Sequence, residues 1–380
     1  MGKNAGEKEH RKEKVLLGIS IVSVIILLGV LIFFHELGHF LAARLSGVGV
    51  LKFSLGFGPK IVGKKIGQTE YVISLIPLGG YVKLLGETEN DKLSADEEKK
   101  SFSKQPPWKR LIIVFAGPFF NFLLAILIFA SVYVYGVPAL SNIVGGVQED
   151  SAAYEAGIIS GDKIISINDK KILYWDDIRP VITQSEGEKL AVRIKRDGQE
   201  KELYITAKLS KTQNILGEEI YAYLIGITPS DEIVIEKRNI WQASIIGLEK
   251  TWQFSKLTLT VFVKMIKGDV SPRNLGGPIF IAQAAGAVAK EGIIPFLFLM
   301  ALISVNLAII NLFPIPILDG GHIMFTLIEM VRRKPLTQKW QGIFQQIGFL
   351  FLILLMIFVI MIDIERLNLK FIDKVVEFFK

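Results

Sequence analysis

Two histidines and a glutamate interrupt the otherwise apolar segment LIFFHELGHFLAA, residues 31–43. His35 and His39 are four residues apart, so on a helix both imidazoles project from one face and can bind a single Zn²⁺ ion. Glu36, next to the first histidine, fits the general base of the H-E-x-x-H pattern. The alternative is two buried histidines with only structural hydrogen bonds. Because ionisable groups in an apolar span are costly, that alternative is disfavoured.

A catalytic zinc usually has three protein ligands and one open position. The chain has no cysteine, which excludes disulfides and thiolate ligands. The segment NLFPIPILDGGH, residues 311–322, offers Asp319 after two prolines. This aspartate could simply end a helix, but its expected depth favours a ligand. About 30 Å of helix precedes His35, which places His35 near the cytoplasmic end of its span, and Asp319 is expected at the same level.

The elements that must position these residues are membrane helices. Of the 380 residues 51% are hydrophobic, and the mean hydropathy is +0.43. The first apolar segment is too long for the apolar part of a cleavable signal peptide. Four segments have roughly the 20 apolar residues that a bilayer requires, and we expect spans at residues 15–45, 111–135, 294–317 and 342–362.

The net charge of +7 does not indicate a nucleic-acid partner, because the positive residues flank apolar segments. Loops between the first two and the last two spans are rich in lysine and arginine, which places both loops in the cytoplasm. The N-terminus, the region between the second and third spans, and the C-terminus are then extracytoplasmic. The basic N-terminal tail argues for the opposite orientation.

Between the second and third spans, short strands alternate with turns. The segment SAAYEAGIISGDKIISIND, residues 151–169, resembles the core of PDZ domains. YGVPALS and SKTQNILG on either side are interpreted as linkers. Such a domain could recruit substrates by their ends, or it could exclude substrates with bulky exterior parts; we expect the second.

Three further segments have recognisable patterns. Residues 52–86 combine strand-like apolar runs with turn residues and lack a helical period, which predicts either a membrane-re-entrant β-region or an ordinary cytoplasmic β-meander. Residues 87–104 are charged and are expected to form a mobile loop. Residues 240–267 carry recurring lysines, so they are interpreted as an interfacial helix, as is the amphipathic tail from residue 364.

HELGH in the first span, GPFFN in the second, one PDZ unit and NLAIINLFPIPILDGG together resemble the site-2 protease family, especially its bacterial RseP-type members. The resemblance covers nearly the whole chain. It implies one catalytic Zn²⁺ held by His35, His39 and Asp319, with Glu36 activating water. It also implies substrate-binding roles for other residues, namely Asn306, Asn311, Gly79, Gly80 and Tyr81. Asn121 is expected to pack the second span against the first.

Two features depart from close members of the family. Several have two PDZ domains where this chain has room for one, and Ala308 stands where a glycine is frequent. Neither change affects a metal ligand. The first bears on substrate selection more than on chemistry.

The predicted fold is a polytopic α-helical membrane protein with four transmembrane helices, a membrane-associated β-region and one extracytoplasmic PDZ domain of the α+β class. The predicted divisions are 1–50, first span with HELGH; 51–107, β-region and loop; 108–137, second span; 138–210, PDZ domain; 211–290, interfacial helices; 291–331, third span with LDGG; and 332–380, fourth span and tail.

The predicted activity is that of an intramembrane zinc metalloendopeptidase in the bacterial inner membrane. Its expected partners are the lipid bilayer and single-pass membrane proteins, such as trimmed anti-sigma factors or signal-peptide remnants, and no nucleic acid. Two alternatives remain open: a zinc-binding membrane protein without protease activity, and a membrane-anchored PDZ scaffold.

Overall fold

The computed structural model describes residues 3–87, 93–213, 219–334 and 336–366. The chain forms two compact units. Unit 1 comprises Met1–Val132 and Ile240–Lys380, and unit 2 comprises Tyr133–Asn239. The predicted amphipathic tail lies almost entirely outside the described residues, as does part of the predicted loop 87–104.

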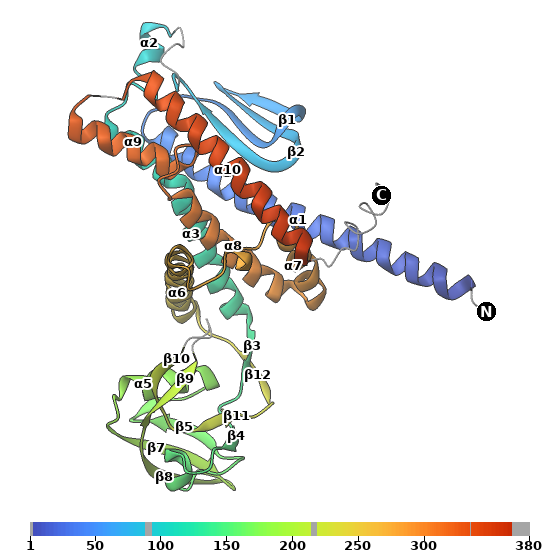
Figure 1. Ribbon diagram of the computed structural model, residues 1–380, viewed down its shortest axis with the longest axis vertical. Helices are drawn as coiled ribbons and strands as arrows, with labels where there is room; N and C mark the ends of the chain where they lie inside the picture. The colour runs from blue at the N-terminus through green and yellow to red at the C-terminus, as the bar shows by residue number, and fades with distance from the viewer. Residues whose placement is uncertain (1–2, 88–92, 214–218, 335, 367–380) are drawn as a thin grey trace. The chain divides into compact units, whose positions relative to one another are not determined.

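Unit 1 is mainly helical (Figure 1). Its elements in chain order are α1 (Lys3–Leu45), β1 (Val50–Ile66), β2 (Thr69–Leu84), α2 (Ala95–Glu98), α3 (Pro107–Tyr135, whose last turn belongs to unit 2), α6 (Ile240–Lys267), η2 (Pro272–Asn274), α7 (Pro278–Glu291), α8 (Ile293–Asn311), α9 (Asp319–Arg332) and α10 (Gln338–Arg366).

Among the described residues, four helical segments are long and apolar enough to cross a membrane: Ser20–Leu45, Pro107–Tyr135, Ile293–Asn311 and Lys339–Arg366. They correspond to the four expected spans. The third ends earlier than predicted, because α8 stops at Asn311 and not near residue 317. Pro314 and Pro316 follow within five residues, and proline removes a backbone donor that a continued helix needs.

The helices α1 and α8 run in the same direction, and α3 runs against both. The ring of Phe298 lies 5.1 Å from that of Phe129, and the Ser304 hydroxyl donates to the Asn121 carbonyl at 2.8 Å. The later residue of α8 thus contacts the earlier residue of α3, so the two helices are antiparallel. The C-terminal end of α8, and with it the start of α9, reaches the level of the HELGH turn in α1.

The strands β1 and β2 are long and bent, and together they form a sheet. Residues 50–55 of β1 pair with residues 80–84 of β2 on one side, and residues 52–55 pair with residues 70–73 of β2 on the other. Phe53 is opposite Val82 on one side and opposite Tyr71 on the other. Gly56, at φ +90°, allows the irregular turn between the two halves of β1. Residues 80–84 consequently form an edge of the sheet in the described part of the chain. This sheet packs on α1 and α3 through a buried cluster that includes Phe40, Ala43, Val50, Phe53 and Ile113.

Helix α6 does not reach the hydropathy of a candidate span. It is seen nearly end-on in Figure 1, where α1, α3 and α10 run across the view. Its buried side consists of small and hydroxyl residues, namely Ala243, Gly247, Thr251 and Ser255. The opposite side exposes Trp241 and Trp252. An interfacial position for α6 stays a prediction.

Unit 2 contains β3 (Val137–Leu140), β4 (Val144–Val147), α4 (Ala152–Glu155), β5 (Lys163–Ile167), β6 (Lys170–Lys171), η1 (Trp175–Asp177), α5 (Ile178–Gln184), β7 (Lys189–Arg196), β8 (Gln199–Thr206), β9 (Lys208–Gln213), β10 (Glu219–Leu224), β11 (Ile227–Pro229) and β12 (Ile233–Glu236). Its largest sheet has the order β6-β5-β7-β8. Alternate residues of β7 are buried, as expected for a strand with one face on a core.

The unit extends beyond the predicted boundary at residue 210. The predicted linker YGVPALS contains β3, which pairs with β12, and β11 pairs with β4. The second predicted linker, SKTQNILG, begins in β9 and continues into residues outside the described part. The interpretation of YGVPALS as a linker was wrong for a physical reason: the strand that pairs with β3 lies more than 90 residues further along the chain. The chain thus enters and leaves unit 2 through one antiparallel ribbon.

A buried ion pair fixes the turn before β5 in unit 2. Both carboxylate oxygens of Asp162 accept from the Arg196 guanidinium at 2.7 Å, and Ile159 N–H adds a third bond at 3.0 Å. The Asp162 side chain is fully buried and that of Arg196 is 22% exposed. Burial raises the pKa of Asp162, but Arg196 and the Ile159 N–H outweigh it, so the pKa lies below its usual range.

We expect Asp162→Asn to destabilise unit 2 by about 3 kcal/mol, because the Arg196 charge loses its partner in a partly buried site. The stabilisation in the wild type should be complete above the unfolded pKa of about 3.9 and should be lost as the pH falls through the lower folded value. Urea-dependent proteolysis of unit 2 in the intact chain measures this. Glu219→Gln, in an exposed pair with Lys211, should cost less than about 1 kcal/mol. Equal effects of the two variants would contradict the prediction.

Candidate metal centre

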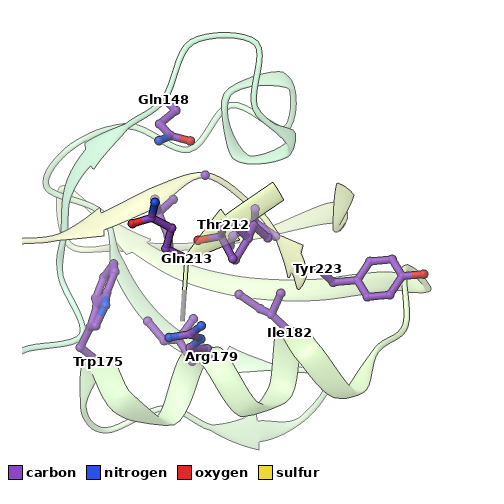
Figure 2. A pocket seen from close by; sticks show the side chains of 12 residues that line it. Gln148, Trp175, Arg179, Ile182, Thr212, Gln213 and Tyr223 are labelled. Atoms are coloured by element: carbon purple, nitrogen blue, oxygen red, sulfur yellow. The ribbon is translucent and has the colours of Figure 1, made fainter. Parts of the chain in front are cut away.

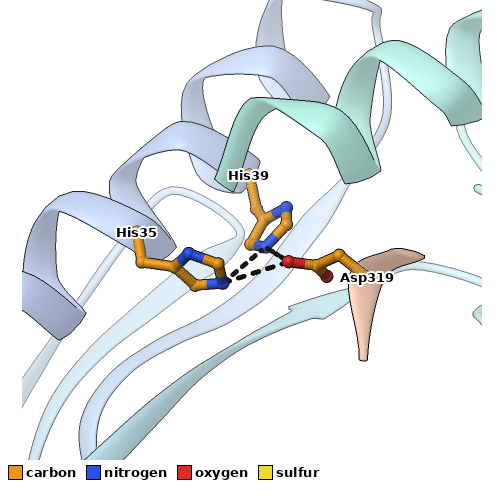
Figure 3. Close-up of side chains that lie close together, drawn as sticks. All are labelled: His35, His39 and Asp319. Carbon is orange, nitrogen blue, oxygen red and sulfur yellow. Dashed lines mark hydrogen bonds and ion pairs between the residues drawn. The ribbon is translucent and has the colours of Figure 1, made fainter. Parts of the chain in front are cut away.

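The structure brings His35, His39 and Asp319 together, although 280 residues separate the aspartate from the second histidine (Figure 3). The two rings come from successive turns of α1, and Asp319 is the first residue of α9. The Nε2 atoms of the rings are 3.3 Å apart. Asp319 Oδ2 lies 3.2 Å from Nε2 of His35 and 3.5 Å from Nε2 of His39.

These three distances fit a tetrahedral zinc ion. Two ligands that are each about 2.0–2.1 Å from such an ion lie about 3.3 Å from one another. In the described part of the chain no hydrogen bond satisfies Asp319 Oδ2, although it is buried. An orphaned carboxylate oxygen facing two ring nitrogens is unfavourable without a cation. The residues present therefore fit a zinc ion.

The orientation of His39 is set by α3. Its Nδ1 lies 2.9 Å from the carbonyl oxygen of Ile113, so Nδ1 carries the hydrogen and Nε2 keeps its lone pair for a metal. A backbone acceptor on the second ring nitrogen is the usual support of a metal-binding histidine.

Two glycines allow α1 and α3 to approach closely. A Cβ atom on Gly38 would lie 2.2 Å from the carbonyl oxygen of Ala116, and one on Gly117 would lie 2.2 Å from Nε2 of His39. Small residues at such crossings let helix backbones come together in membranes. Gly117 belongs to the GPFFN segment, which thus packs directly under the histidine rings.

The position of Asp319 depends on the chain on both sides of it. Cβ atoms on Gly320 and Gly321 would collide with the carbonyl oxygens of residues 312, 313 and 315, so only glycine permits this tight start of α9. An ion pair between Arg110 of α3 and Glu329 holds the far end of α9, and both side chains are less than a fifth exposed. The glycines thus fix the start of α9, with the carboxylate, on the preceding loop, and the ion pair fixes its far end on α3.

Glu36 is buried beside the centre and contacts the sheet edge. Its carboxylate accepts a hydrogen bond from the backbone N–H of Val82. A Cβ on Gly80 would lie 3.0 Å from Glu36 Cγ and 2.9 Å from the side chain of Ile32. The edge strand of β2 therefore runs next to the predicted general base.

The predicted substrate-binding residues lie in different surroundings. Gly80 and Tyr81 lie on this edge strand and Gly79 directly precedes them in β2, and the Tyr81 ring stacks parallel on Phe57 at 6.2 Å. Asn306 is engaged elsewhere, because its Oδ1 accepts from the Thr258 hydroxyl of α6 at 2.7 Å. Asn311 is the last residue of α8 and is half-buried.

Sequence reasoning missed the Val82 N–H, the Ile113 carbonyl and the Arg110–Glu329 pair. Backbone groups carry no residue-type signal, so only the predicted strand and helix could have indicated the first two. The ion pair joins residues 219 positions apart.

Unit 2 has a cavity of its own, of about 260 Å³. Figure 2 shows it between α5, which contributes Arg179 and Ile182, and the strand β9 with Thr212 and Gln213. Trp175 closes one end, and Gly226 is also among the lining residues.

Comparisons with known proteins place most of this chain in one family. The model of peptidase family M50 matches residues 23–355. A "putative zinc metalloprotease" of Campylobacter jejuni is 36% identical over 358 residues, covering 93% of this chain and 96% of the relative. The regulator of sigma E protease of Haemophilus influenzae is 32% identical, covering 92% and 99%. A PDZ domain of an SdrC-like protein from Listeria monocytogenes is 20% identical at a TM-score of 0.19, covering 23% of this chain and 86% of that one.

Proposed function

Because this chain belongs to peptidase family M50, the site-2 proteases, we propose that it is a zinc metalloendopeptidase that hydrolyses peptide bonds within transmembrane segments of other proteins. The observation that carries the proposal is the convergence of His35, His39 and Asp319 at zinc-ligand spacing, with Glu36 between this centre and the edge of a sheet. A zinc-binding protein without protease activity gives Glu36 and that edge no role.

We assign His35, His39 and Asp319 as the zinc ligands and Glu36 as the general base. A zinc ion held by these residues would act as a Lewis acid and would lower the pKa of water at the centre. The Glu36 carboxylate takes the proton of the attacking water and later delivers it to the leaving amine nitrogen. The hydrogen bond from the Val82 N–H helps to orient the carboxylate for this transfer.

A transmembrane helix must unwind before it can be cut, and unpaired backbone groups in lipid are costly. We propose that the edge strand with Gly79, Gly80 and Tyr81 pairs with the unwound substrate by strand addition. This strand is next to Glu36, so the paired bond would lie near the reacting groups. Exposed apolar side chains on the outer part of the sheet, including Ile61, Val62, Ile73 and Leu75, support its contact with lipid.

The cellular test compares the membrane proteins of cells that carry the wild type with those of cells that carry Glu36→Gln. Short single-pass fragments, such as trimmed anti-sigma factors or signal-peptide remnants, should accumulate only with the variant. Identical membrane proteomes would count against the proposal.

We propose further that unit 2 is a PDZ domain on the extracytoplasmic side and that it excludes substrates with bulky exterior parts. Leu140 pairs with Ile233 at the base of the unit. Residues 141–232 can therefore be replaced by Asn-Gly, which closes the two strands as a hairpin. We expect this variant to cut trimmed substrates as before and also to cut untrimmed ones.

If the cavity of unit 2 instead recruits substrates, the same replacement lowers the cleavage of trimmed substrates. A matched control keeps the unit and carries Glu200→Gln in β8, where the side chain is exposed. That control should retain wild-type selectivity.

A further inference from the structure

Three residues on one face of α3 support the two histidines of α1. Ile113, Gly117 and Asn121 are spaced by four residues and share a helix face. The Ile113 carbonyl accepts from Nδ1 of His39 at 2.9 Å, and Gly117 leaves room for both rings. Asn121 Nδ2 as placed lies 3.3 Å from Nδ1 of His35. Asn121 was expected only to pack the spans, but its side chain contacts a predicted ligand.

The amide as placed conflicts with metal binding by His35. When Nε2 of a neutral imidazole offers its lone pair to a metal, Nδ1 carries the hydrogen. That N–H would then face the NH₂ end of Asn121, so two donors would meet. The two ends of an asparagine amide have nearly the same shape, and their assignment follows from hydrogen-bond partners.

Among the described residues, the hydrogen bond with His35 determines which end of the Asn121 amide faces the ring. Asn121 is fully buried, and its Oδ1 has no hydrogen-bond partner among the described residues. No hydrogen bond at the Oδ1 end therefore has to be broken when the Asn121 amide rotates by 180°. The backbone is held independently, because Ser304 of α8 donates to the Asn121 carbonyl at 2.8 Å.

We infer that Asn121 is a positioning residue that presents its side-chain oxygen to the Nδ1–H of His35 and so keeps Nε2 of His35 free for zinc. α3 then supplies one oxygen acceptor to each histidine, a carbonyl for His39 and an amide oxygen for His35. The inference rests on the proposed zinc ligands.

The test measures the dissociation constant for Zn²⁺ of the full-length protein by competition with a chelator. Asn121→Leu removes the acceptor at similar volume and should weaken zinc binding about 10–100-fold, as loss of such a support does elsewhere. Asn121→Asp keeps an oxygen towards the ring and should stay close to the wild type. Ser304→Ala disturbs the same turn without touching His35 and should also bind zinc normally.

The outcomes separate the inference from the function on which it rests. If His39→Ala keeps its zinc, the ligand set itself is wrong and the inference is overturned with it. If His39→Ala loses zinc but Asn121→Leu does not, only the inference is overturned. Equal losses in Asn121→Asp and Asn121→Leu would also overturn it, because the NH₂ end would then be the one required.

A measurement on the wild-type protein tests the protonation of the His35 ring directly, and a variant serves only to assign the signals. In the zinc-loaded protein with ¹⁵N-labelled histidine, the ring signals of His35 are identified by their absence in His35→Gln. We expect Nδ1 of His35 to carry a hydrogen. An unprotonated Nδ1 would overturn the inference.

Discussion

Glu36→Gln is expected to slow cleavage about 10²–10⁴-fold, the usual contribution of a general base, while the protein keeps its zinc. The amide has the shape of the carboxylate and can still accept from the Val82 N–H, but it cannot take a proton from water. None of the three ligand atoms is altered. Cleavage of a single-pass substrate in proteoliposomes gives the rate, and elemental analysis of the same sample gives the zinc content.

A surface variant controls for expression and reconstitution. Glu98 in α2 is exposed, so Glu98→Gln should match the wild type in both measurements. If Glu36→Gln cleaved as fast as the wild type, Glu36 could not be the base. If it lost zinc together with activity, its role would be structural.

Gly117→Ala is expected to disable the centre through one added carbon. The new Cβ would lie 2.2 Å from Nε2 of His39 and 2.9 Å from Cε1 of His35, closer than atoms can pack. His39 cannot turn aside without losing its bond to Ile113. We expect zinc affinity to fall at least about tenfold, as for other disturbances of ligand orientation, and cleavage to fall with zinc occupancy.

Gly29→Ala provides the matched control, because a Cβ on this glycine of α1 meets nothing within 4 Å. The same change inside a helix should there leave zinc binding and cleavage unchanged. Normal zinc affinity in Gly117→Ala would show that α1 and α3 do not meet at the rings as described.

The HELGH part of the centre was predictable because its geometry is local: a spacing of four residues places both imidazoles on one helix face. Bringing in Asp319 required an argument about depth in the membrane, since 280 residues separate it from His39. The direction of α8 relative to α3 agrees with that argument. The end of α8 was placed too late, because the prolines were treated as the close of the span and not as the start of a loop.

The remaining details depend on pairing between distant segments. Unit 2 continues to residue 239 because the partners of β3 and β4 lie at residues 227–236, and no local pattern marks such pairing. The contact of Val82 with Glu36 is a backbone contact, so the sequence carried no sign of it. Asn121 was recognised as important, but its orientation towards His35 required the crossing of α1 and α3.

The most direct test of the central claim is the position of the bond that is cut. The zinc-loaded protein and a single-pass substrate are reconstituted in lipid vesicles, and mass spectrometry identifies both new termini. We predict that they lie inside the apolar segment of the substrate and that they are absent with Glu36→Gln. Termini outside that segment, or the same termini with Glu36→Gln, would contradict intramembrane proteolysis by this centre.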